Sequence, residues 1–142
     1  MKTLNIIYWS GTGNTEMMAE GIKKGAETKD VKVNLVRAEE AELNHVIEAD
    51  LVAFGCPSMG AEVLEEAAME PFIDSLNGNN INKPTVLFGS YDWGDGEWMR
   101  NWEERMSEYG SNIIGEPLIL QNTPDDDGLS ECEALGAKLA SC

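Results

Sequence analysis

The amino-acid sequence predicts an α/β protein built on a doubly wound parallel sheet, with helices on both faces. Two observations support this fold class. Short apolar runs alternate along the chain with segments of helical spacing, an order typical of parallel sheets. Residues 51–54 read Leu-Val-Ala-Phe, and a strand that is apolar at every position is buried on both faces. The length of 142 residues suits a single domain, residues 1–142, with a substantial core.

Five strands and five helices are expected in strict alternation. The expected strands are residues 4–9, 31–36, 50–55, 85–89 and a last one around 113–120, and the expected helices are residues 14–28, 39–44, 70–76, 97–109 and 129–140. The acidic run Asp125-Asp126-Asp127 is expected to cap the last helix. Open parallel sheets bind ligands at the carboxyl ends of their strands. The loops after the first, third and fourth strands are therefore the candidate binding loops.

The chain is strongly acidic, with 26 acidic and 10 basic residues and a net charge of −16. Nucleic acids and anionic membranes both require a basic surface, so neither is an expected partner. The charge favours basic partner proteins instead. No apolar run reaches the roughly 20 residues needed to span a bilayer, and the first residues lack the pattern of a signal peptide. A cytoplasmic protein is therefore expected.

Metal centres and nucleophilic catalysis are not expected. Cys56, Cys132 and Cys142 have no paired spacing, which argues against zinc, iron–sulfur and disulfide frameworks. His45 is the only histidine, so any catalytic triad would have to use it. It lies in a polar stretch, which is more typical of a surface residue than of a catalytic one. No arginine follows Cys56 at the spacing of a Cys-x5-Arg phosphatase loop, and the first and third strands end without the acidic residues of a phosphoacceptor receiver domain.

The loop after the first strand is the most informative segment. Residues 10–15 read Ser-Gly-Thr-Gly-Asn-Thr. A glycine turn that leads into a helix offers free N–H groups and a positive dipole end to an anion. The P-loop lysine is absent, and Glu16 replaces the third glycine of the dinucleotide fingerprint. A terminal monophosphate fits what remains, with ligands from Ser10, Thr12, Asn14, Thr15 and the backbone N–H groups of residues 11–15, which include Gly11 and Gly13.

The loops after the third and fourth strands suit a flat aromatic ring. Trp93 lies in a glycine turn, outside the periodic spacing of the next helix, and a large ring there needs a partner such as a stacked heteroaromatic ligand. Tyr91 is a candidate second ring. Met59 suits the face of a ring, and Glu62 can accept a hydrogen bond from a ring N–H. Together with a phosphate cradle, these groups describe flavin mononucleotide (FMN).

Several segments of the chain carry a resemblance to one known family. They are Tyr8-Trp9-Ser10-Gly11-Thr12-Gly13-Asn14-Thr15-Glu16, Gly55-Cys56-Pro57, Met59-Gly60, Glu70-Pro71-Phe72, Leu87-Phe88-Gly89-Ser90-Tyr91 and Trp93-Gly94. On these motifs the chain resembles the flavodoxins, in particular the short-chain group of anaerobic bacteria, over essentially its whole length. The resemblance implies a flavodoxin-like, five-stranded sheet of order 2-1-3-4-5, non-covalent FMN and one-electron transfer between redox enzymes.

The resemblance also implies a role for each candidate residue. The implied phosphate ligands are Ser10, Thr12, Asn14 and Thr15. The isoalloxazine ring is flanked by Met59 and Trp93, its N3–H is bound by Glu62, and the loop beside it contains Ser58, Gly60 and Ala61. The pyrimidine edge is followed by Ser90, Tyr91, Asp92, Trp93 and Gly94, and the far side of the ring site is shaped by Asn122. The Gly60–Ala61 peptide is expected to flip on partial reduction. Asp92 and Ala61 depart from the family pattern, which usually has a glycine and a polar residue there.

The implied function is that of a low-potential one-electron carrier that shuttles between the semiquinone and hydroquinone of FMN. Carboxylates and phosphate near the ring oppose the second electron, because that electron makes the ring anionic. The expected partners are redox proteins with basic docking faces, namely oxidoreductases normally served by ferredoxin, and the chain is expected to be a monomer. Two alternatives stay open, a small FMN-dependent reductase of quinones or nitro compounds and a protein that binds FMN without redox work.

Overall fold

A parallel sheet is the framework of the molecule. A computed structural model describes residues 1–142. The strands are β1 (Lys2–Tyr8), β2 (Val31–Arg37), β3 (Leu51–Gly55), β4 (Pro84–Tyr91), β5 (Asn112–Ile113) and β6 (Leu118–Gln121). Paired strands run parallel in the order β2-β1-β3-β4-β5, and β6 also pairs with β4. The expected order 2-1-3-4-5 is confirmed.

The last strand is divided, unlike the single strand expected around residues 113–120. β5 pairs with the start of β4, at Pro84 and Thr85, whereas β6 pairs with its end, at residues 88–91. Between them, Gly115 has a φ of 67° and Pro117 has no N–H to donate. Because neither residue supports a regular ladder, one edge strand becomes two short segments along β4.

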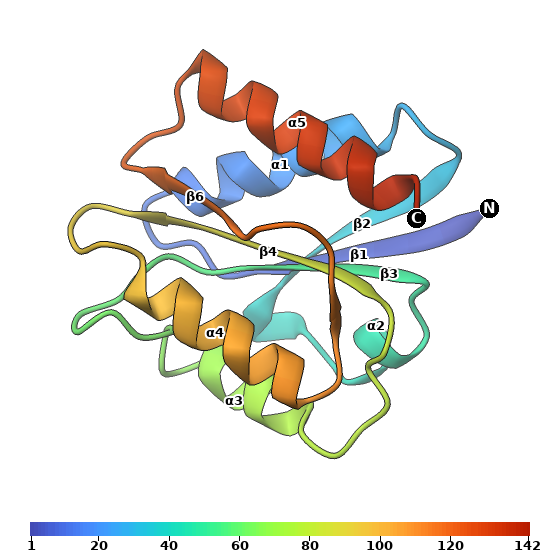
Figure 1. Cartoon of the computed structure of the whole chain (residues 1–142), viewed down its shortest axis with the longest axis horizontal. Helices are drawn as coiled ribbons and strands as arrows, with labels where there is room; N and C mark the ends of the chain where they lie inside the picture. Colours follow the sequence, from blue (N-terminus) through green and yellow to red (C-terminus); the bar gives the residue numbers. More distant parts are fainter.

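Helices cover both faces of the sheet (Figure 1). α1 (Asn14–Ala26) and α5 (Asp126–Ala140) lie on one face, and α2 (Asn44–Ile47), α3 (Met69–Ser75) and α4 (Glu97–Glu108) lie on the other. Alternate residues of β1 divide accordingly, because Leu4 and Ile6 belong to one buried core and Ile7 to the other. The doubly wound α/β fold is thereby confirmed. None of its helices is both long and apolar enough to cross a membrane.

The prediction of a helix at residues 39–44 is wrong. A short 3-10 helix spans Ala38–Glu40, the chain is extended at Ala41, and α2 begins only at Asn44. The Nδ1 atom of His45 accepts the N–H of Glu42 at 2.9 Å, and this contact stabilises a turn rather than a helix before α2.

The last helix begins earlier than expected, at Asp126 rather than at residue 129. Asp125 precedes it, and its Oδ1 accepts the N–H of Gly128 at 2.7 Å. The acidic run therefore both caps the helix, as expected, and forms its first turn, where negative charge is favourable.

The start of α3 depends on a buried carboxylate in the loop after β3. Glu65 accepts the N–H groups of Ala67, Ala68 and Met69 at 2.7, 2.7 and 2.9 Å. Burial by itself raises the pKa of this carboxyl, but the three N–H donors outweigh it and hold the pKa below its ordinary value of 4.5. Glu65 thus caps α3 and anchors the loop that leads into it.

Replacing Glu65 by Gln should make stability less dependent on pH. The carboxylate contributes its full stabilisation above pH 4.5 and loses it as the pH falls through the lowered pKa. We expect Glu65→Gln to lower the free energy of unfolding by about 1 kcal/mol at pH 7 and by less at pH 3. Urea unfolding at both pH values checks this. The control is Glu66→Gln, which removes an exposed carboxylate; an equal loss for Glu65→Gln at both pH values would contradict the prediction.

Candidate functional site

A cavity of about 440 Å³ lies at the carboxyl ends of β1, β3 and β4. Its lining includes Gly11, Thr12, Asn14, Ser58, Met59, Ser90, Tyr91, Asp92 and Asn122, all of them candidates from the sequence. Trp9 and Pro57 also line it and were not candidates. Both directly precede a candidate loop residue, and that position could have identified them. The fold thus joins four separate segments of the chain in one cavity.

Backbone N–H groups at the start of α1 are the main polar donors of this cavity. Gly13 has a left-handed φ of 99° and directly precedes the helix. The Oγ of Ser10 accepts the N–H groups of Gly13 and Glu16 at 3.2 Å each. The N–H groups of Gly11, Thr12, Asn14 and Thr15 form no hydrogen bond within the protein. Four free donors at a positive dipole end make an anion site, and no Lys or Arg lines the cavity.

The hydroxyls of this turn differ in their surroundings. Thr15 is buried, and its Oγ1 lies 2.7 Å from the Oγ of Ser90, so this pair fastens the turn to β4. Thr12 is exposed at the cavity and has no partner for its hydroxyl. Ser10 accepts two N–H groups and keeps its own proton free to donate.

The loop after β3 forms a small hairpin at one side of the cavity. Met59 and Val63 exchange two backbone hydrogen bonds, of 2.9 and 3.0 Å, and Gly60 between them has a φ of 44°. Gly60 and Ala61 are exposed at the tip and do not line the cavity. The N–H of Ser58 donates to the carbonyl of Ser90 at 2.9 Å. This bond extends the β3–β4 pairing and places Met59 beside the cavity.

Glu62 is buried below this hairpin rather than in the cavity wall. Its Oε1 accepts the N–H groups of Gly96 and Glu97 at 3.3 and 3.2 Å, so the carboxylate caps α4. Gly94 lies against it, since a Cβ at that position would come within 2.5 Å of Oε1. The backbone of Glu62 has a φ of 56°, which is unusual for a residue with a side chain.

The aromatic turn contains one packed ring and one exposed ring. Tyr91 lines the cavity, and its ring centroid lies 5.7 Å from that of the buried Trp98. Trp93 is 58% exposed and does not line the cavity. A ring of that size in solvent is available for stacking on a ligand or a partner.

The segment after β6 closes the far side of the cavity. Asn122 has a φ of 61°, and its N–H donates to the carbonyl of Tyr91 at 2.7 Å. Gln121 Nε2 donates to the carbonyl of Asp92 at 3.2 Å. Thr123 Oγ1 donates to Asn14 Oδ1 at 3.1 Å. This segment therefore connects the aromatic turn with the first turn of α1.

Cys56 is not a nucleophile in this setting. It is fully buried at the end of β3, and burial raises the pKa of its thiol to about 12. Its Sγ accepts the N–H of Glu65 at 3.4 Å and donates to the carbonyl of Pro57 at 3.4 Å. The thiol therefore stays protonated near neutral pH and supports the loop.

The donors and walls of the cavity fit FMN. Free N–H groups and hydroxyls without a cation suit a terminal phosphate, whereas Trp9, Met59 and Tyr91 offer apolar and aromatic surface to a flat ring. Asp92, in the aromatic turn, is the one carboxylate of the lining.

Comparisons with known proteins give the same answer. The Flavodoxin family model matches residues 6–136. Flavodoxin from Clostridium beijerinckii is 45% identical over 138 residues, covering 97% of this chain and 99% of that protein. Flavodoxin from Megasphaera elsdenii is 41% identical over 137 residues, covering 96% and 98%.

Solved structures agree with these relatives. Two-electron reduced flavodoxin from Megasphaera elsdenii has a TM-score of 0.84 and 39% identity, over 98% of this chain and 99% of that one. A flavodoxin from the domain Archaea has a TM-score of 0.89 and 30% identity, over 98% and 96%. Because the family match spans nearly the whole chain and these two curated relatives, at 41–45% identity, are plain flavodoxins, the chain belongs to the flavodoxin family and is an FMN-binding electron carrier rather than an enzyme.

Proposed function

We propose that the protein is a low-potential one-electron carrier that binds the FMN phosphate on residues 10–15 and the FMN ring beside Met59 and the aromatic turn. The observation that carries this proposal is the set of four N–H donors without an acceptor and without a neighbouring cation. A phosphate satisfies these donors, and its charge stays uncompensated. Bound FMN can accept two electrons in successive one-electron steps, and the second electron leaves the ring negatively charged.

The full site of the proposal combines the sequence candidates with the two residues found in the cavity wall. Met59 and Trp93 flank the ring, and Glu62 accepts the ring N3–H while it caps α4. The exposure of Trp93 supports this placement, because a stacked ring removes apolar surface from water. The site comprises Trp9, Ser10, Gly11, Thr12, Gly13, Asn14, Thr15, Pro57, Ser58, Met59, Gly60, Ala61, Glu62, Ser90, Tyr91, Asp92, Trp93, Gly94 and Asn122.

Asp92 is the carboxylate best placed to lower the second reduction potential. Two other carboxylates near the cavity have N–H partners, since Glu62 caps α4 and Glu65 caps α3. Asp95 pairs with Arg100 at 3.0 Å. Asp92 lines the cavity, is exposed and has no such partner for its carboxylate. Its charge therefore opposes electron addition without local compensation.

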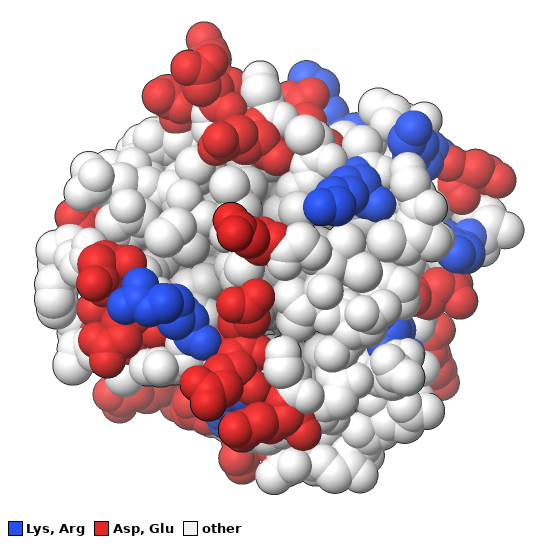
Figure 2. Space-filling model, in the orientation of Figure 1, with Lys and Arg blue, Asp and Glu red and all other residues white.

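The distribution of charge supports docking of a basic redox partner at the cavity. The seven lysines lie at the amino ends of strands or the carboxyl ends of helices, which is the end of the molecule opposite the cavity; they are Lys2, Lys23, Lys24, Lys29, Lys32, Lys83 and Lys138. Most of the basic groups in Figure 2 accordingly lie on the side of the two chain termini. Because the lysines lie at the opposite end, electrostatic attraction favours docking of a positively charged partner surface at the cavity.

The proposed partners are thus oxidoreductases normally served by ferredoxin. In this proposal residues 1–142 form one domain, and the protein acts as a monomer in the cytoplasm. A small FMN-dependent reductase of quinones or nitro compounds is not favoured, because the relatives at 41–45% identity are flavodoxins that match over nearly their whole length.

A carboxylate in the anion-binding turn should discriminate between FMN and riboflavin. We expect Thr12→Asp to weaken FMN binding on the order of 100-fold, since no cation offsets the repulsion of the phosphate. Riboflavin lacks the phosphate, so its affinity should change little. Quenching of flavin fluorescence measures both constants. Ser107→Asp adds the same charge at an exposed site on α4 and serves as the control; equal losses for FMN and riboflavin would disprove the phosphate placement.

Removing the charge of Asp92 should raise the second reduction potential. We expect Asp92→Asn to shift it upward by about 10–50 mV and to leave the first potential nearly unchanged. A spectroscopic redox titration with dithionite checks both values. The matched control is Asp95→Asn, because Asp95 is paired with Arg100 and does not line the cavity. The idea fails if both variants shift the second potential equally.

Docking by charge should depend on ionic strength. We expect the reduced protein to transfer electrons to cytochrome c, a basic acceptor, at a bimolecular rate that falls as salt rises from 0.01 to about 0.2 M, because the screening length shrinks from about 30 Å to below 8 Å. Stopped-flow mixing measures the rate. A neutral small-molecule acceptor is the control, and a salt-independent rate with cytochrome c counts against the docking proposal.

A further inference from the structure

The loop after β3 is tied to α4 at three points. At its start, the carbonyl of Cys56 accepts the indole N–H of Trp98 at 3.2 Å. In its middle, Glu62 caps the amino end of α4. At its end, Glu70 binds Arg105, near the other end of α4. The segment that forms one side of the cavity is thus attached along the length of a single helix.

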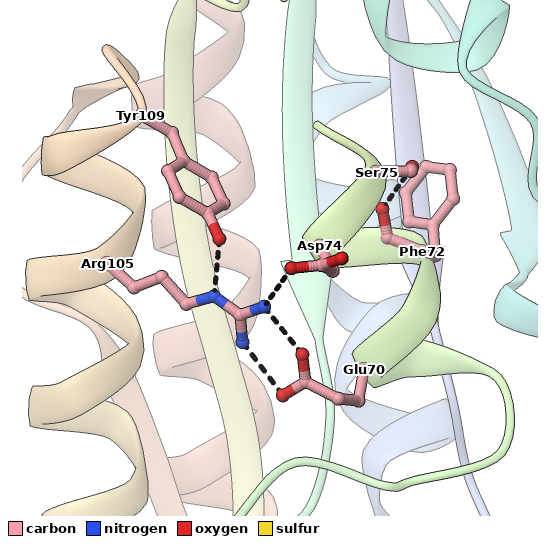
Figure 3. A network of polar contacts seen from close by, with 6 residues as sticks. All are labelled: Glu70, Phe72, Asp74, Ser75, Arg105 and Tyr109. Carbon is pink, nitrogen blue, oxygen red and sulfur yellow. Dashed lines mark hydrogen bonds and ion pairs between the residues drawn. The ribbon is translucent and has the colours of Figure 1, made fainter. Parts of the chain in front are cut away.

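Arg105 makes the last of these attachments through a planar fork (Figure 3). Its Nη1 donates to Glu70 Oε1 at 2.8 Å, and its Nη2 donates to Glu70 Oε2. Its Nε donates to the hydroxyl of Tyr109 at 2.9 Å, and Asp74 Oδ1 lies 3.8 Å from Nη2. The Arg105 side chain is only 24% exposed. Two parallel hydrogen bonds with limited solvent access hold Glu70 in one position.

Packing between the loop and α4 is incomplete. A cleft of about 130 Å³ lies between the loop and α4, lined by Glu62, Val63, Leu64, Glu70, Trp98, Asn101, Trp102 and Arg105. The Nε1 of Trp102 is buried there without any hydrogen-bond partner. Val63, above the cleft, is 46% exposed. Leu64 packs into the core, but side chains leave this cleft unfilled, so the polar contacts at either end add to packing in fixing the loop.

We propose that Arg105 is a positioning residue, which through Glu70 holds the Met59–Glu62 hairpin at the distance from α4 that FMN binding requires. This inference rests on the proposed FMN site. Glu70 lies in the first turn of α3, and Glu65 fastens that helix start to the loop, so a displacement of Glu70 is passed on to the hairpin. Arg105 itself does not line the cavity.

Two variants separate positioning from simple electrostatics. Arg105→Met makes the net charge more negative by one, whereas Glu70→Gln makes it more positive by one. An electrostatic effect therefore has opposite signs in the two variants, whereas a lost attachment has the same sign in both. We expect the dissociation constant of FMN to rise by about 3–10-fold in both variants. We also expect the second reduction potential to move in the same direction in both.

The same helix supplies the controls. Arg100 and Asp95 form an ion pair of 3.0 Å whose side chains are 61% and 79% exposed, and this pair does not involve the loop after β3. Arg100→Met and Asp95→Asn repeat the two charge changes, and each should alter the FMN dissociation constant by less than about twofold. Amide hydrogen exchange of residues 59–66 should be faster in Arg105→Met and Glu70→Gln and unchanged in both controls.

The outcomes are distinct. Changes of opposite sign in Arg105→Met and Glu70→Gln, or a lower unfolding free energy with unchanged FMN affinity and unchanged exchange at residues 59–66, would overturn the positioning role. Should Arg105→Met fail to fold, Arg105→Lys keeps the charge without the planar fork and should still raise the FMN dissociation constant. A Thr12→Asp variant that binds FMN normally would overturn the proposed phosphate site, whatever the Arg105 variants show.

Discussion

The free N–H groups at the start of α1 are the interaction on which the site depends. The first turn of any helix has N–H groups without acceptors. Here Ser10 accepts two N–H groups of the turn, and four others form no hydrogen bond within the protein, three of them on residues that line the cavity. The Thr15–Ser90 contact and the Thr123–Asn14 bond then hold this turn against β4 and the segment after β6. The remaining loops are arranged around an anion site that the backbone itself provides.

Three acidic residues in and just after the loop that follows β3 have structural partners. Glu62 caps α4, Glu65 caps α3, and Glu70 binds Arg105. A count of acidic residues in the sequence therefore overstates the uncompensated charge around the ring. Asp92 differs, because it lines the cavity and its carboxylate has no partner. Asp92, one of the two residues that depart from the expected family pattern, is thus the carboxylate of the cavity lining whose charge has no local compensation.

Much of the fold could be predicted because local patterns and the sheet agree. Alternating apolar runs and helical segments correspond to the observed order of strands and helices, including the edge position of the last strand. The errors have local causes. The side chain of His45 stabilises a turn at residues 42–43, where a helix was expected, and Gly115 with Pro117 divides the last strand. Trp9 and Pro57 were missed because they carry no polar signature, although they lie next to the predicted loops.

The sequence by itself determined the fold class and the class of cofactor, because these depend on residues that are close together in the chain. Only the tertiary structure decided what each buried polar side chain contacts. Thr15 meets Ser90 across 75 residues, and Arg105 meets Glu70 across 35. Such pairs form where packed elements bring donors and acceptors together, and each buried group takes the partner that lies within reach. Glu62, whose sequence position suggests a ligand to the ring, therefore also caps α4.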